Sequence, residues 1–210
     1  MASKAFHGSC HCGSIQYLVR VTLPPDTTNA SPFTPGTHIY KCNCTTCHKA
    51  GFFHLRPNSA SEDFLLLSPN PSELGDYSCL TKQMHWYFCK TCGVKPFCGA
   101  GGWVKEEVDV NAWKGEEKRD GEGKKKTAWK LTTKEVEIEK ADRKIKKEVL
   151  SLNVNATTLD ARQEGLDLRE WHEKKWVFYL DVLDFDVSSY KEGMPMPAMG
   201  FEGPYPGGMY

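Results

Sequence analysis

The run Cys42-Asn43-Cys44-Thr45-Thr46-Cys47 places three thiols within one short turn, in the pattern Cys-x-Cys-x-x-Cys. Three thiols this close cannot each occupy a separate apolar slot, but they can converge on one metal ion, because thiolates are preferred ligands of Zn²⁺. Three protein ligands leave one corner of a tetrahedral ion open, as in catalytic zinc sites. A fourth protein ligand from elsewhere in the chain would instead make an inert structural site. The spacing alone leaves both alternatives open.

Four other cysteines lie in two close pairs. Cys10 and Cys12 are flanked by glycines, and Cys89-Lys90-Thr91-Cys92-Gly93 has the zinc-knuckle pattern, in which a positive φ at the glycine turns backbone amides toward the sulfurs. Neither pair completes a tetrahedron alone. We therefore expect the two pairs to share one structural zinc and the central run to hold a second zinc. The alternative is that one pair joins the central run, which would leave the other two thiols without a complete metal site.

The composition is typical of a globular protein. The chain has 210 residues, 27 basic and 27 acidic side chains, and 40% hydrophobic residues. No apolar run approaches the roughly 20 residues that a membrane-spanning helix needs, and the N-terminus lacks an apolar signal segment. Nine cysteines without an export signal favour metal ligands over disulfides, because the cytosol keeps thiols reduced. These features predict a cytoplasmic metalloprotein without a membrane partner, and they leave its oligomeric state open.

Short extended segments dominate the chain. Alternating or β-branched residues predict strands at residues 15–21, 38–40, 51–55, 63–67, 74–80, 85–88, 149–155 and 176–180, with one helical turn at residues 166–171. We expect a polar lead-in at residues 1–9, a proline-rich loop at residues 22–37 and a break at residues 99–102. The prediction is a mainly β, single zinc-binding domain over residues 1–185, followed by a Pro/Gly/Met-rich tail over residues 186–210.

Residues 104–147 are expected to form a charged insertion between core strands. From residue 114 onward the insertion carries 13 basic and 8 acidic side chains. Acidic residues alternate along residues 135–139, and basic residues alternate along residues 144–146. Opposite charges on adjacent strands favour a solvated hairpin, in which each cross-strand pair contributes about 0.2–1 kcal/mol. A basic patch for nucleic acid is the alternative, but no aromatic residues are interleaved at the lysine cluster. Nucleic acid is therefore not the expected partner.

The ligand type of the central run points to chemistry at sulfur. Three thiolates give a zinc complex with net negative charge, which is a poor Lewis acid for water but holds another soft ligand well. Zinc keeps a substrate thiol deprotonated near neutral pH and leaves it nucleophilic. The catalytic candidates are therefore Cys42, Cys44 and Cys47, and the expected partner is a small-molecule thiol.

Other side chains could assist this site. His85 precedes the knuckle and could serve as an acid, a base or a donor to a zinc ligand, although a packed or exposed strand histidine is the more common case. His48, next to Cys47, could fill the fourth corner. Surface, strand or buried apolar positions are predicted for the remaining candidates, His11, His54, Cys79 and Cys98.

Together the three cysteine motifs resemble a known family. Gly8-x-Cys10-x-Cys12-Gly13, Cys42-x-Cys44-x-x-Cys47-x-Lys49-x-Gly51 and Phe88-Cys89-x-x-Cys92-Gly93 are similar to the glutathione-dependent formaldehyde-activating enzymes, also called the centromere protein V family. The resemblance covers residues 6–103 and 148–182. It implies an Mss4-like β-tent of antiparallel strands and two zinc ions, one structural on Cys10, Cys12, Cys89 and Cys92 and one on Cys42, Cys44 and Cys47. It also implies a carbon–sulfur lyase-type activity that joins formaldehyde to glutathione as co-substrate.

The chain departs from the family pattern at positions beside the ligands. Thr45 stands where Ser is usual, His48 where Arg is common, and Cys98 where Gly is frequent. The ligands themselves are unaffected, but no motif fixes the residues that would hold glutathione. Two alternative functions follow: a tailoring lyase or isomerase that acts on a larger metabolite, and a non-enzymatic zinc scaffold that binds protein or nucleic acid.

Overall fold

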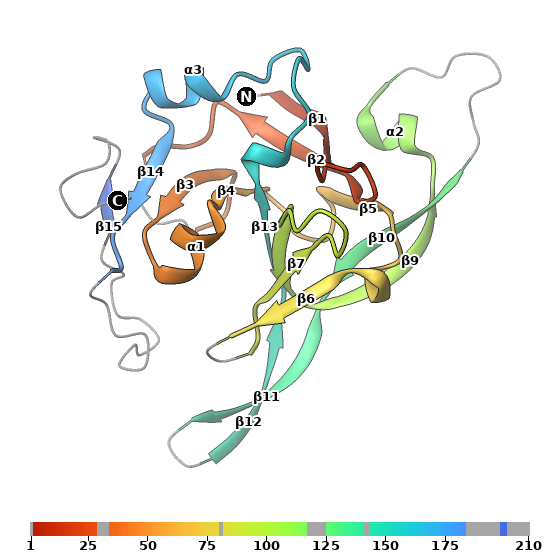
Figure 1. Ribbon diagram of the computed structural model, residues 1–210, viewed down its shortest axis with the longest axis vertical. Helices are drawn as coiled ribbons and strands as arrows, with labels where there is room; N and C mark the ends of the chain where they lie inside the picture. Colours follow the sequence, from red (N-terminus) through yellow and green to blue (C-terminus); the bar gives the residue numbers. More distant parts are fainter. Residues whose placement is uncertain are drawn as a thin grey trace.

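Strands from distant parts of the chain build the fold shown in Figure 1. The computed structural model describes residues 2–28, 34–79, 82–116, 125–140, 143–183 and 198–200. The predicted tail over residues 186–210 lies outside the described residues except for residues 198–200. The tip of the predicted insertion, residues 117–124, also lies outside them.

Within the described ranges, the strands form two large sheets and one separate two-stranded ribbon. The five-stranded sheet is antiparallel and has the order β1 (Ala2–Ser9), β2 (Gln16–Leu23), β5 (Phe64–Ser68), β10 (Lys126–Thr132) and β9 (Gly102–Val108). The eight-stranded sheet has the order β15 (Ala198–Gly200), β14 (Val177–Leu180), β3 (His38–Cys42), β4 (Phe53–Arg56), β13 (Ser151–Asn155), β8 (Phe97–Ala100), β7 (His85–Phe88) and β6 (Gly75–Ser78). The ribbon pairs β11 (Lys134–Lys140) with β12 (Arg143–Val149). The prediction of a mainly β fold with antiparallel sheets is confirmed.

The helices are short. They are α1 (Thr45–Ala50), α2 (Val110–Lys114) and α3 (Leu168–Glu173), with single 3₁₀ turns η1 (Pro71–Glu73) and η2 (Ala156–Thr158). In the part of the chain that the structure describes, no helix has the length and apolarity needed to cross a bilayer.

The two large sheets bury one core between them. Tyr17 of β2 stacks on Phe64 of β5 with ring centroids 5.5 Å apart, and Phe97 of β8 meets Phe64 edge-on at 5.1 Å. All three rings are fully buried. Burial of each of these large side chains stabilises the folded state by about 1.5–3 kcal/mol. Their mutual packing therefore helps to set how the two sheets face each other.

The outer face of the eight-stranded sheet is also covered. Strand alternation turns Tyr40 and Trp86 away from the inter-sheet core, and they form a second buried cluster with Cys47 and Phe52 beside α1. On the five-stranded sheet, α2 supplies the corresponding cover through Val110 and neighbouring side chains. The short helix α1 therefore covers this second buried cluster, and Cys42 and Cys47 of the central cysteine run belong to the cluster.

Two expectations for the backbone were wrong. Residues 1–9 are not a lead-in, because Ala2–Ser9 is a strand that pairs with β2 along its whole length and buries Phe6. Residues 99–102 are not an extended break, because β8 runs to Ala100 and β9 starts at Gly102. Gly99 is needed there for close pairing, since a Cβ at this position would lie 2.8 Å from the Ser151 carbonyl oxygen on β13.

The predicted insertion divides into two parts. Strands β9 and β10 extend the five-stranded sheet, where Trp129 pairs with Leu66 of β5. The ribbon β11–β12 projects away from the sheets in Figure 1 and has the predicted cross-strand charge pairs, Lys144 with Glu137 and Lys146 with Glu135, each at 2.8 Å. Only the ribbon is thus an appendage, because the first half of the segment is part of the body of the fold.

Candidate metal centres

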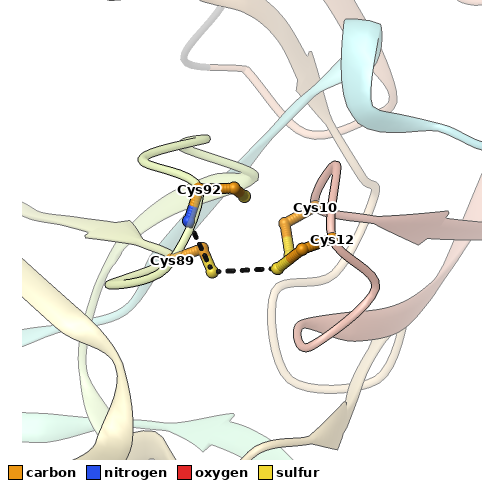
Figure 2. Close-up of side chains that lie close together, drawn as sticks. All are labelled: Cys10, Cys12, Cys89 and Cys92. Atoms are coloured by element: carbon orange, nitrogen blue, oxygen red, sulfur yellow. Dashed lines mark hydrogen bonds between the residues drawn. The ribbon is translucent and has the colours of Figure 1, made fainter.

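The first cysteine group joins two turns that are far apart in the chain. Figure 2 shows Cys10 and Cys12 on one turn facing Cys89 and Cys92 on the other. The four sulfurs lie within 4.8 Å of one another, with 3.6 Å between Cys10 and Cys12 and 3.5 Å between Cys12 and Cys89. Four sulfurs at zinc–sulfur distances of about 2.3 Å are about 3.8 Å apart along the edges of a tetrahedron. The donor set and its spacing therefore fit a zinc ion.

The two turns are closed in the same way. The Cys10 amide donates to the Ile15 carbonyl at 3.1 Å, and the Cys89 amide donates to the Val94 carbonyl at 2.9 Å. The glycine that follows each pair has a left-handed φ, 76° in the first turn and 75° in the second. In this geometry backbone amides point at the sulfurs. The Ile15 amide donates to Cys10 Sγ at 3.3 Å, and the Cys92 amide donates to Cys89 Sγ at 3.5 Å.

The position of this first group in the fold favours a structural role. Cys10 and Cys89 belong to the buried core between the two large sheets, whereas Cys12 is exposed. Cys12 and Cys89 are 77 residues apart in sequence. An ion shared by these turns would tie the start of the five-stranded sheet to the end of β7 in the eight-stranded sheet.

The second cysteine group lies at the junction of β3 and α1. Cys42 ends β3, Cys44 is the N-cap of α1 and accepts the Cys47 amide at 3.4 Å, and Cys47 is buried on the helix. The Cys44 amide in turn donates to Cys42 Sγ at 3.4 Å. The three sulfurs lie within 4.8 Å of one another, and among the described residues no further His, Cys, Asp or Glu joins the group. This set of three soft donors also fits zinc.

Asn43 holds the second group in place, a role that the sequence analysis missed. Its side chain is buried, donates from Nδ2 to Asp181 Oδ1 at 2.6 Å and accepts the Val182 amide at 2.7 Å. Its own amide donates to the Leu180 carbonyl at 3.3 Å. Strand β14 is also the parallel neighbour of β3, with Leu180 opposite Cys42. The turn between Cys42 and Cys44 is therefore fixed to the end of β14 and the two residues that follow it.

We expect Asn43→Ala to weaken metal binding at the second group without unfolding the protein. The substitution leaves the buried Val182 amide without its acceptor, which costs about 1–3 kcal/mol, and it frees the turn that carries Cys42 and Cys44. Metal analysis should show a loss of one ion per chain, together with a modest fall in melting temperature. The matched control is Asn70→Ala, which removes an exposed helix cap and should keep both ions. Full metal content in Asn43→Ala would contradict the assigned role.

His54 is the second residue that the sequence analysis did not place at the site. It lies on β4 as a strand residue, and its Nε2 is 3.1 Å from Cys47 Sγ. The ring stacks on Tyr40 with centroids 4.3 Å apart. Burial lowers the pKa of His54 to about 3, so the imidazole is neutral at physiological pH. Strand alternation was the available signal, because residue 54 shares the outer face of the sheet with the cysteine layer.

A cavity of about 220 Å³ adjoins the second group. Cys42 and Cys47 form part of its wall, together with polar and apolar side chains: Tyr40, His54, Arg56, Met84, Trp86, Cys98, Ser151, Asn153 and Leu180. The Tyr40 hydroxyl donates to Asn153 Oδ1 at 3.0 Å, which fixes both side chains. The cavity thus combines sulfur donors, one cation and hydrogen-bonding groups in a mostly apolar setting.

The other candidates lie in different places. His85 is on β7 with Nδ1 2.8 Å from an Asp76 carboxylate oxygen, on the opposite face of the strand from Trp86, so the structure does not bring it to the cysteines. His48 is exposed on α1 and is not part of the three-sulfur group. Cys98 is buried as predicted, but its side chain also lines the cavity.

Two of the predicted surface or apolar candidates lie near the groups without joining them. Cys79 is half-buried, with its sulfur 3.9 Å from Thr46 Oγ1 at the start of α1. His11 is exposed between Cys10 and Cys12.

Comparison with known proteins adds little to this picture. The chain matches no protein-family model. It is similar to a Rhodobacter sphaeroides structural-genomics protein of known crystal structure, with 16% sequence identity over 78% of this chain and 93% of that chain and a TM-score of 0.38. A likeness at this level carries no argument about function.

Proposed function

We propose that the chain is a zinc enzyme of carbon–sulfur lyase type, which joins a small-molecule thiol such as glutathione to a small electrophile such as formaldehyde. The observation that carries the proposal is the cavity beside the three-sulfur group, because Cys42 and Cys47 form part of its wall. An Mss4-like β-tent with a structural zinc on Cys10, Cys12, Cys89 and Cys92 is part of the same proposal.

Cys42, Cys44 and Cys47 would hold the second zinc. When bound, zinc at such a site keeps a substrate sulfur deprotonated and nucleophilic near neutral pH. The chain itself positions the three sulfurs through the helix cap at Cys44, the Asn43 hydrogen bonds and the contact between His54 and Cys47. A site fixed by three independent contacts is preorganised, so little energy is lost in ordering it during the reaction.

The cavity wall would serve the electrophile. Trp86, Met84 and Leu180 supply apolar wall, and Arg56 would offer a positive charge for the negative charge that develops on a carbonyl oxygen. In the reaction the thiol loses its proton to solvent, and a sulfur lone pair forms the new carbon–sulfur bond. The carbonyl π pair moves to oxygen, which then takes a proton from solvent, so nothing is oxidised or reduced.

The size of the cavity favours a small electrophile over a larger metabolite. Pockets for drug-sized ligands usually span about 300–1,000 Å³, and this cavity measures about 220 Å³. A one-carbon or two-carbon aldehyde fits such a space.

The test is to measure the rate of formaldehyde loss with glutathione, for zinc-loaded and for metal-depleted protein. We expect the loaded protein to exceed the spontaneous rate and the depleted protein to match it. Cobalt-substituted protein should also show a changed thiolate absorption when glutathione is added, because a fourth sulfur joins the ion. Equal rates for both forms, with no spectral change, would refute the proposal.

A further inference from the structure

We propose that the open edge of strand β12, in the β11–β12 ribbon, binds an extended segment of a partner protein in which acidic residues alternate with apolar ones. Most of the ribbon belongs to the insertion at residues 104–147, which the family resemblance does not cover. The proposed function uses no residue of the ribbon. The inference therefore goes beyond that function and concerns a separate interaction surface.

The outer edge of β12 is open. In the part of the chain that the structure describes, β12 pairs with β11 and with no other strand. The ribbon also projects away from both large sheets in Figure 1. A two-stranded hairpin is marginally stable in water, whereas a sheet of three strands can be stable on its own. An added strand would therefore pair with the open edge and stabilise the ribbon.

The charge of this edge favours an acidic strand. Over residues 144–149, β12 has three lysines, Lys144, Lys146 and Lys147, and one acidic residue, Glu148. All four side chains are exposed. Opposite charges on neighbouring strands attract and like charges repel. The edge is therefore suited to an acidic partner strand and opposes a basic one.

The pairing inside the ribbon shows which kind of strand β12 accepts. Between its terminal lysines, β11 alternates glutamate with valine or isoleucine, and it pairs with β12 in antiparallel register. Glutamates of β11 form ion pairs with Lys144 and Lys146 at 2.8 Å, whereas Ile138 lies opposite Ile145. The two lysine side chains are still 77% and 72% exposed, so each has room to face a carboxylate on the open side. A strand with the alternation of β11 would repeat this arrangement at the outer edge.

The other face of the ribbon offers apolar contacts. Directly paired residues point to the same side of a sheet, so Val136, Ile138, Ile145 and Val149 share one face. Ile145 is 38% exposed. A hairpin with both faces in water gains nothing from collecting its apolar residues on one side. A partner strand that places its own apolar side chains beside Ile145 and Val149 would bury them, and this burial is favourable.

Other occupants fit this edge less well. A nucleic acid would meet the glutamates that lie among the lysines, and neither strand of the ribbon has an aromatic residue on which a base could stack. A second copy of the chain could offer its own β11. Such pairing is head-to-tail, however, and leaves an open edge at each end, so it does not close into a defined oligomer. A separate acidic segment is the occupant that completes the edge.

The experiment uses the full chain and a short capped peptide that alternates glutamate with valine. A peptide that alternates lysine with valine is the charge control, and a single-stranded oligonucleotide tests for a general polyanion site. Fluorescence anisotropy measures binding, and hydrogen–deuterium exchange locates it. The test variant is Lys144→Gln with Lys146→Gln. The matched control is Glu135→Gln with Glu137→Gln, which removes the same two ion pairs and keeps the charges of β12.

We expect the glutamate peptide to bind the unmodified chain and to slow exchange at the amides of β12, but not at those of β9, another edge strand. The lysine variant should bind the peptide about tenfold more weakly, since two opposite-charge contacts between strands are lost. The glutamate variant should bind at least as tightly as the unmodified chain.

Three outcomes would overturn the inference. The first is unchanged exchange at β12, or equal binding of the glutamate and lysine peptides. The second is binding of the oligonucleotide as tight as that of the glutamate peptide, which would indicate a nucleic-acid site. The third is self-association of the free chain that the glutamate peptide abolishes, which would make a second copy the occupant.

Discussion

Cys89→Ser is expected to unfold the protein. Structural zinc contributes about 10–16 kcal/mol of apparent binding energy, whereas the net stability of a domain is about 5–15 kcal/mol. A serine oxygen replaces one of the four sulfurs that would bind the proposed zinc between the two large sheets, at a position that is 4% exposed. Removal of this ligand therefore takes away a contribution as large as the whole margin of stability.

The measurement for Cys89→Ser combines circular dichroism, thermal melting and metal content. We expect loss of the β-sheet spectrum or a melt below 37 °C, with both ions released. Cys79→Ser is the matched control, because Cys79 is a half-buried cysteine outside both groups. It should melt close to the unmodified chain. A native spectrum for Cys89→Ser with its full metal content would show that this group is not a structural centre.

Cys44→Ser is expected to remove most of the proposed activity in a chain that still folds. Serine is a favourable N-cap, so it can accept the Cys47 amide as Cys44 does now. The fold should therefore lose less than about 1 kcal/mol. A hydroxyl is a poor ligand for zinc beside two thiolates, however, and the second ion should be lost or held weakly.

The expected result for Cys44→Ser is one metal ion per chain and a fall in glutathione–formaldehyde turnover of at least about 100-fold, the range seen when a single key electrostatic group is removed. Cys79→Ser serves again as the control and should keep full turnover. Unchanged turnover after the loss of one ion would rule out a catalytic role for the second group, and the scaffold alternative would then be favoured.

Local patterns in the sequence were sufficient for most strands and for the grouping of the seven clustered cysteines. Alternating, β-branched character in residues 15–21 indicates β2, and the continuous apolar run of residues 176–180 indicates β14, which is buried along its whole length. The division into four and three cysteines also followed from spacing and from the number of ligands that zinc takes. These signals are contained within short stretches of chain.

The parts that were missed depend on contacts between distant segments. Strand β1 looks polar in sequence and is a strand only because it pairs with β2. The six residues of α1 are too few to show helical periodicity. The roles of Asn43 and His54 arise from partners on other strands, Asp181 on the segment after β14 and Tyr40 on β3. No local pattern specifies such pairs.

The hydrogen bond between Asn43 and Asp181 also sets an order of events during synthesis. The two residues are 138 positions apart. The three central cysteines therefore emerge from the ribosome well before Asp181 is synthesised. All four cysteines of the first group are present once residue 92 has emerged, whereas the hydrogen bonds that hold Asn43 need residues 181 and 182. A chain that stopped short of residue 181 would carry all seven clustered cysteines and lack the segment whose hydrogen bonds hold the turn between Cys42 and Cys44.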